Sequence, residues 1–198
     1  MATKQTKLDA VNIILSNIGQ APVVNLESGN PMVETAEVVL DEISRTVQSE
    51  GWVFNTEFGY PFTPDASSEI LIPDNVLSLD LPAISRHFAQ IRGGKLYNRT
   101  DHTYEWSDSQ KLDVVWLFDY EDLPEAFKNY ITIRAANVFA GRSVGSSEAV
   151  RFGQQEELQS RAGALEYDTQ QGDYSVFGDS QGLNQYNAFR PSNSVFRY

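Results

Sequence analysis

Two histidines lie close to serine and acidic residues in the middle of this sequence, as they do in some hydrolases. His87 and His102 are a few positions away from Ser85, Asp101 and Glu105. Such side chains work together only when the fold aligns them, because geometry and not composition defines a Ser-His-Asp triad. Serine and acidic residues are also frequent in this region. We therefore interpret the proximity as chance and assign no catalytic residue.

Acidic residues beside aromatic ones suggest a second kind of chemistry, the hydrolysis of glycans. A glycosidase needs two carboxyl groups a few ångströms apart with different pKa values. The candidates lie near Trp52, Tyr104 and Trp106, and they are Glu57, Glu69, Asp101, Glu105 and Asp108. Most of the 27 acidic residues of a chain like this one form a hydrated surface. An enzyme that degrades glycans such as peptidoglycan or capsule is therefore kept as an alternative.

The sequence lacks the motifs of metal and cofactor sites. It contains no cysteine, which excludes disulfides, thiolate catalysis and zinc sites built on cysteine. It has no glycine-rich phosphate loop, no dinucleotide fingerprint, no calcium-binding loop and no His-x-x-x-His pair. We predict no cofactor and no metal. Arg134, within an apolar helix, is expected to pair with a carboxylate.

Charge and hydropathy limit the partners of the chain. The 198 residues carry a net charge of −12, whereas proteins that bind DNA through its phosphates need clustered lysine and arginine. This disfavours a DNA-packaging or replication accessory. The N-terminal residues lack the apolar core of a signal peptide, and no apolar run has membrane-spanning length. We expect a soluble protein that is made in a cytoplasm.

The clearest predicted helix covers residues 120–142, with Asp122 as its cap, Pro124 in its first turn and Gly141 at its end. Its apolar residues recur at steps of three and four, and they are Phe127, Tyr130, Ile131, Ala135, Val138 and Phe139. A stripe this wide requires packing partners.

Two amphipathic helices are predicted before it. The first covers residues 7–18, with Thr6 as its cap, and places Leu8, Val11, Leu15 and Ile18 on one side. The second covers residues 31–50, with Asn30 as its cap and Pro31 at its first position. Its stripe consists of Met32, Ala36, Val39, Leu40, Ile43 and Val47.

Residues 52–119 are predicted to form an antiparallel β lobe. Aromatic residues alternate from Trp52 to Phe62 among glycine and proline. A two-residue turn at Gly93-Gly94 would form a hairpin that sets Ile91 opposite Leu96. A further strand over residues 111–118 would place on one face Leu112, Val114, Trp116 and Phe118.

A fourth helix is predicted to start at residues 145–148, capped by Ser146 or Ser147. Its apolar line is thin, and we expect it to be solvated or to face a polar partner; the line consists of Val150, Leu158, Ala162 and Leu165. The last segment has few aliphatic residues but spaced aromatic ones, which favours a docking arm over a disordered tail.

The predicted fold is therefore α+β: a four-helix bundle with an inserted antiparallel β lobe and an extended C-terminal arm. The bundle comprises residues 1–51 and 120–172, the lobe residues 52–119 and the arm residues 173–198.

Several short segments occur in an order typical of one known family. They are Ala10–Gly19 followed by Pro22-Val23, Gln48–Asn55, Arg92–Gly94, Tyr120–Glu125, Glu166–Asp168 and Gly172–Tyr174. With these segments the sequence resembles the tail tubular protein A family of short-tailed bacteriophages, the head-to-tail adaptor beneath the portal. The matches run from about residue 8 to residue 177 and leave the last twenty or so residues without a counterpart.

The resemblance implies a structural virion protein without enzymatic turnover. Its copies would form a dodecameric ring between the portal and the tail tube or nozzle protein, at the head-tail junction, with tail fibres attached nearby. Genomic DNA would pass through the lumen without specific binding, and no membrane partner is implied. Before assembly the protein would be in the host cytoplasm.

Two sets of contact residues are predicted within that assembly. The tip of the hairpin, Gly93 and Gly94, would point toward the tail tube. Contacts with the portal or a neighbouring copy would be made by residues of the fourth helix and the arm: Glu148, Arg151, Glu157, Arg161, Tyr174, Phe177, Tyr186, Phe189, Phe196 and Tyr198.

Overall fold

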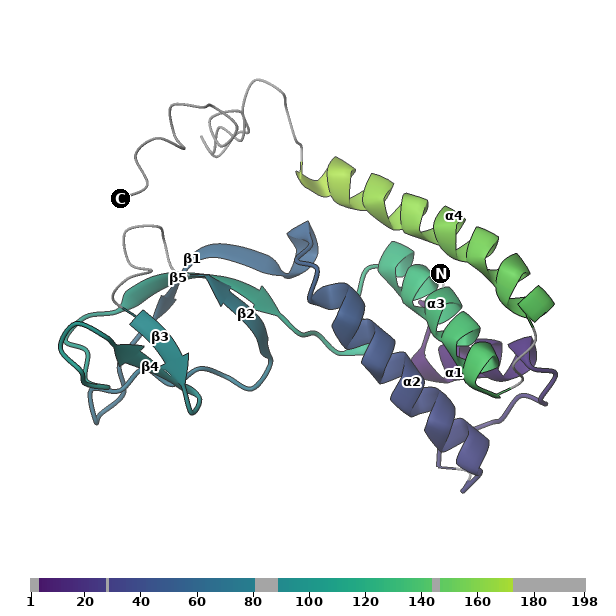
Figure 1. Cartoon of the computed structure of the whole chain (residues 1–198), viewed down its shortest axis with the longest axis horizontal. Coiled ribbons are helices and arrows are strands. Elements are labelled where there is room, and N and C mark those ends of the chain that lie inside the picture. The colour runs from purple at the N-terminus through teal and green to yellow at the C-terminus, as the bar shows by residue number, and fades with distance from the viewer. Residues whose placement is uncertain (1–3, 28, 81–88, 144–146, 173–198) are drawn as a thin grey trace.

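The computed structural model describes residues 4–27, 29–80, 89–143 and 147–172 (Figure 1). These residues form a mixed α+β fold with helices gathered at one end and antiparallel sheets at the other. The α-helices are α1 (Lys7–Asn17), α2 (Pro31–Gln48), α3 (Glu125–Ser143) and α4 (Ser147–Gly172). The strands are β1 (Thr56–Phe62), β2 (Val76–Asp80), β3 (Ala89–Arg92), β4 (Lys95–Asn98) and β5 (Gln110–Trp116). None of the helices in the described part of the chain is long and apolar enough to cross a membrane.

The first two helices begin where the sequence predicts. Thr6 and Asp9 form a capping box at the start of α1, and Asn30 accepts a hydrogen bond from the backbone N–H of Met32 at the start of α2. Each cap satisfies backbone donors that have no partner inside the helix. Pro31 occupies the first position of α2, as predicted.

The helix α3 starts later and ends later than predicted. Leu123 precedes a proline, which disfavours helical backbone, and it is extended with φ −70° and ψ 148°. Residues Tyr120–Asp122 therefore form a separate 3₁₀ turn, η2, and Asp122 does not cap α3. At the other end α3 continues through Gly141 to Ser143, held by the ion pair between Arg142 and Glu42.

The helical core is built around α3, which packs against α1, α2 and α4. Phe127 is fully buried, and its ring lies 4.9 Å from that of Trp52 and 4.6 Å from that of Phe54. These two residues were expected to belong to a strand. Trp52 instead directly precedes the short 3₁₀ turn η1 (Val53–Asn55), and Phe54 lies within that turn. The strand β1 starts only at Thr56. The aromatic run is thus divided between two cores, because Phe62 packs with the sheets.

The β region contains a three-stranded antiparallel sheet in the order β1-β5-β2 and a separate β3–β4 hairpin. The turn at Gly93 and Gly94 has φ values of 57° and 72°, which only glycine adopts readily, and it pairs Ile91 with Leu96. The predicted hairpin and its register are confirmed.

The predicted common face of the last strand is wrong at one residue. Leu112, Val114 and Trp116 pack in the core between sheet and hairpin, whereas Phe118 packs against the helical core. The strand ends at Trp116, so the alternation of side chains ends there too.

We expect the stability of the fold to decrease in acid. Hydrogen bonds from Thr6 lower the pKa of Asp9, and the hydrogen bond from Arg142 lowers the pKa of Glu42. A carboxyl group whose pKa is lower in the folded state stabilises above its unfolded pKa, about 4, and loses this contribution as pH falls through the folded value. Urea unfolding of the wild type and of Asp9→Asn from pH 3 to pH 7 measures the effect. The wild type should lose more stability on acidification than the variant; parallel curves would contradict the assignment.

Candidate functional site

The helix α4 contacts the rest of the chain with the side opposite to its predicted apolar line. Leu158 is 70% exposed, Leu165 is 45% exposed and Ala162 is exposed as well. The buried residues are Ser160 and Ala164, and Tyr167 packs edge-on against Phe127. The helix is predicted to be solvated or to face a polar partner; on its buried side Ala164 and Tyr167 join the apolar core around α3. The predicted apolar line is a separate, outward-facing strip; Val150 lies outside the described side chains.

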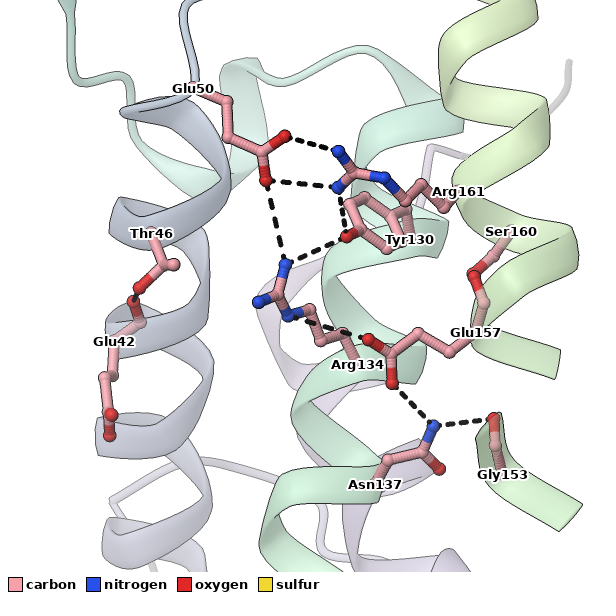
Figure 2. Close-up of polar contacts among 10 residues, drawn as sticks. All are labelled: Glu42, Thr46, Glu50, Tyr130, Arg134, Asn137, Gly153, Glu157, Ser160 and Arg161. Carbon is pink, nitrogen blue, oxygen red and sulfur yellow. Dashed lines mark hydrogen bonds and ion pairs between the residues drawn. The ribbon is translucent and has the colours of Figure 1, made fainter. Parts of the chain in front are cut away.

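The packing side of α4 carries a network of charges shared with α2 and α3 (Figure 2). The carboxylate of Glu50, just after α2, accepts two hydrogen bonds from Arg161, at 2.7 and 3.1 Å. It also lies 3.7 Å from the guanidinium of Arg134. Both arginines donate to the hydroxyl of Tyr130, at 2.7 and 2.9 Å. One tyrosine and one carboxylate thus hold two arginines from different helices together.

A second carboxylate completes the network. Glu157 lies 3.6 Å from Arg134 and accepts a hydrogen bond from the side-chain amide of Asn137. Two carboxylates thus face two guanidinium groups, so the charges between the helices balance. The hydrogen bonds with Glu50 and Tyr130 raise the pKa of Arg161 above its usual range. The predicted pairing of Arg134 with a carboxylate is confirmed.

The helices α4 and α3 approach each other closely at Gly153. The amide of Asn137 donates a hydrogen bond of 2.8 Å to the carbonyl oxygen of Gly153 (Figure 2). A Cβ atom on Gly153 would lie 2.1 Å from the side-chain oxygen of Asn137, far inside van der Waals contact. A side chain at this position would therefore force Asn137 to move from its hydrogen bond with Gly153.

Buried amides connect the helical core with the sheet. The side chain of Gln48 is fully buried; it donates a hydrogen bond to the carbonyl oxygen of Phe118 and accepts one from the Phe118 N–H, at 3.0 and 2.9 Å. The amide of Asn55 donates to the carbonyl oxygens of Gln48 and Trp116. The end of α2 and the end of β5 are thereby fixed to each other.

The same junction reaches α4. The carboxylate of Asp168 accepts a hydrogen bond of 2.8 Å from the backbone N–H of Val53 in the 3₁₀ turn η1. Two segments that resemble the family, Gln48–Asn55 and Glu166–Asp168, are therefore in contact in space. Their residues determine how α4 and the sheet are attached to the helical core.

Comparison with known proteins agrees with the resemblance carried by these segments. Residues 8–174 match the family described as tail tubular protein. The chain belongs to the tail tubular protein family. It is also similar to the tail tubular protein A of Klebsiella phage KP34, with 30% identity over 156 residues, which is 76% of this chain and 81% of that protein. The chain is therefore a structural protein of a bacteriophage tail, and its location is the virion.

The histidine and serine residues singled out in the sequence form no triad in the described part of this tail tubular protein. His102 is exposed, and its ring nitrogen Nδ1 lies 3.5 Å from the hydroxyl of Tyr97. Asp101 accepts a hydrogen bond from Asn98. Ser85 and His87 lie outside the described residues.

The candidate carboxylates are spread over the β region. Glu69 and Glu105 lie opposite each other in an isolated antiparallel bridge, and Glu69 forms an ion pair with Lys95. Asp108 accepts a hydrogen bond from the neighbouring Ser107, and Glu57 is exposed on β1. A cleft of about 270 Å³ lies elsewhere, between α2 and the segment after β5, and none of the five candidates lines it.

The predicted partner contacts fall into three groups. Gly93 and Gly94 form the exposed hairpin tip. Glu157 and Arg161 contact α3 and the end of α2 within the chain, and their contact with a partner stays a prediction. The side chains of the remaining residues lie outside the described part of the chain; they are Glu148, Arg151, Tyr174, Phe177, Tyr186, Phe189, Phe196 and Tyr198.

Sequence reasoning did not identify the residues that organise this site. In the sequence Gln48 and Asn55 stand out only as members of the segment Gln48–Asn55, and no local pattern gives Glu50 or Tyr130 a polar role. One signal was present: Gln48 follows Val47 on the buried side of α2, where an amide needs polar partners.

Proposed function

We propose that this tail tubular protein is the head-to-tail adaptor of a short-tailed phage. Its copies form a dodecameric ring that joins the portal to the tail tube or nozzle protein, with tail fibres attached nearby. The observation that carries the proposal is the family match over residues 8–174. The similarity to a protein named tail tubular protein A supports it.

We further propose a division of labour within the chain. Residues 1–51 and 120–172 form a helical bundle that makes the ring wall, and residues 52–119 form a lobe directed toward the tail tube and the fibres. Two groups of buried apolar residues support a helical part and a separate lobe: one surrounds α3 and the other lies between the sheet and the hairpin. Trp52, Phe54 and Phe118, at the two ends of the lobe segment, pack with the group around α3. The tip at Gly93 and Gly94 is exposed and free to meet the tail tube.

In this proposal the protein has no enzymatic turnover. Its role is to hold two rings together around a channel that DNA crosses. The net charge of −12, repeated around the ring, keeps DNA from adhering where acidic residues line the lumen. The fourth helix and the arm, residues 173–198, make the contacts with the portal or a neighbouring copy.

A truncation tests the role assigned to the arm. Removing residues 178–198 should leave a folded chain that no longer joins the portal, because the removed segment carries four of the six predicted aromatic anchors: Tyr186, Phe189, Phe196 and Tyr198. Circular dichroism checks the fold, and co-sedimentation with the portal protein of the same phage measures binding. Truncated chain that co-sediments as well as the full chain would contradict this role.

A further inference from the structure

The outward face of α4 is nearly uncharged in a chain with a net charge of −12. Its centre is the strip defined above: Leu158, Ala162 and Leu165, which recur at steps of four and three residues. That spacing is the one by which helices pack against each other. Core positions of protein interfaces are depleted of charge in the same way.

One carboxylate borders this strip. Glu166 is exposed, and its carboxylate accepts a hydrogen bond of 3.4 Å from Gln170 but makes no ion pair within the described residues. A partner that covers the strip therefore needs a cation beside an apolar residue. Its other contacts must be uncharged or already neutralised.

The outer face of α2 carries an apolar residue and a cation in this arrangement. Val38 is 65% exposed, and Arg45 follows seven residues later on the same side of the helix. Arg45 has no ion pair in the described part of the chain. Two carboxylates of this face are already neutralised, because Glu42 pairs with Arg142 and Asp41 with Lys7. Glu34, four residues before Val38, is exposed and makes no ion pair within the described residues; with Val38 at Leu158 it would lie level with the uncharged Gln154.

The two faces point away from each other. In Figure 1 α3 lies between α2 and α4, and in Figure 2 Glu42 and Thr46 lie on the side of α2 that is turned away from α4. Complementary surfaces on opposite sides of one subunit make a head-to-tail contact, which closes into a ring when the rotation between copies permits.

We propose that the outer face of α4 packs against the outer face of α2 of a neighbouring copy of this chain. The inference rests on the proposed ring and names the contact within it. Arg45 lies about 11 Å from Val38 along α2, and Glu166 lies about 12 Å from Leu158 along α4. In a parallel alignment Val38 therefore covers the strip at Leu158 while Arg45 meets Glu166.

Paired cysteines test the contact directly, since the chain has no cysteine of its own. The double variant Val38→Cys/Leu158→Cys is mixed with the portal protein of the same phage and treated with a short thiol crosslinker. A ladder of crosslinked copies is expected, because each copy carries one cysteine for each neighbour. Neither single variant should give a ladder. The pair Ile13→Cys/Leu158→Cys is the matched control, because Ile13 is 44% exposed on α1.

Light scattering of the same samples separates the two levels of the hypothesis. A ring mass without a ladder overturns the contact and leaves the proposed adaptor standing. Crosslinks from Leu158→Cys to the portal in place of a second copy also overturn it. If no ring mass forms on intact portal, the proposed function fails and the contact fails with it.

A charge exchange provides the second test. Arg45→Glu and Glu166→Arg should each raise the protein concentration for half-maximal ring assembly about tenfold, because each places like charges together. The double variant Arg45→Glu/Glu166→Arg should recover most of this loss, with unchanged circular dichroism in all three. Equal, additive losses in the double variant would contradict the pairing.

Discussion

Replacing Gln48 by methionine is expected to destabilise the protein by about 2–4 kcal/mol. Methionine has a similar length but cannot replace the two hydrogen bonds with the backbone of Phe118. The N–H and carbonyl groups of Phe118 would then be left without these partners, and the bond to Ser44 would be lost as well. Urea unfolding measures the change in the free energy of unfolding. Hydrogen exchange at the Phe118 amide should report local opening at the junction of α2 and β5.

The exposed Gln154 on α4 is a matched control for this substitution. Gln154→Met should change the free energy of unfolding by no more than about 0.5 kcal/mol. The amide of Gln154 bonds to water in both the folded and the unfolded state, so removing it affects the two states alike. A Gln48→Met variant as stable as this control would show that the junction is not held by the buried amide.

Replacing Gly153 by alanine should destabilise the protein by about 1–3 kcal/mol, although alanine is the better helix former. The new Cβ would lie 2.1 Å from the side-chain oxygen of Asn137. Asn137 must then move, and its hydrogen bonds to Gly153 and Glu157 are lost or lengthened. These bonds attach the part of α4 around Gly153 to α3. Limited proteolysis should therefore cut α4 faster in this variant.

Gly163 lies in the same helix and provides a control with the opposite sign. A Cβ there meets no atom within 4 Å. Gly163→Ala should therefore stabilise the protein by about 0.5–1 kcal/mol through helix propensity alone. Equal effects of the two alanine substitutions on the unfolding midpoint would contradict the close approach at Gly153.

Elements with local signals could be predicted from the sequence. The caps Thr6 and Asn30, the proline at the start of α2 and the Gly93-Gly94 turn all act through their own or neighbouring backbone. A few consecutive residues therefore determine where these caps and turns occur. The late start of α3 belongs to the same class, because Leu123-Pro124 is a local signal that the predicted cap did not take into account.

Features that depend on tertiary contacts could not be predicted in the same way. The thin apolar line of α4 predicts a helix that is solvated or faces a polar partner, but it does not show which side packs. The helix is held by Glu157, Arg161 and the small residues between them. Hydrophobic periodicity identifies the apolar face of a helix, but it gives no signal for a packing face built from balanced charges. Lys128 is a further residue whose burial depends on tertiary contacts, since only 1% of it is exposed. Its buried ammonium group is satisfied by the carbonyl oxygen of Gln5 and by the carboxylate of Glu125.

The most direct test of the proposed adaptor is the mass of the purified full-length chain, measured by light scattering alone and after mixing with the portal protein of the same phage. We predict a monomer in isolation and a ring of chains bound to each portal in the mixture. A chain whose mass does not change in the presence of intact portal would contradict the proposed function.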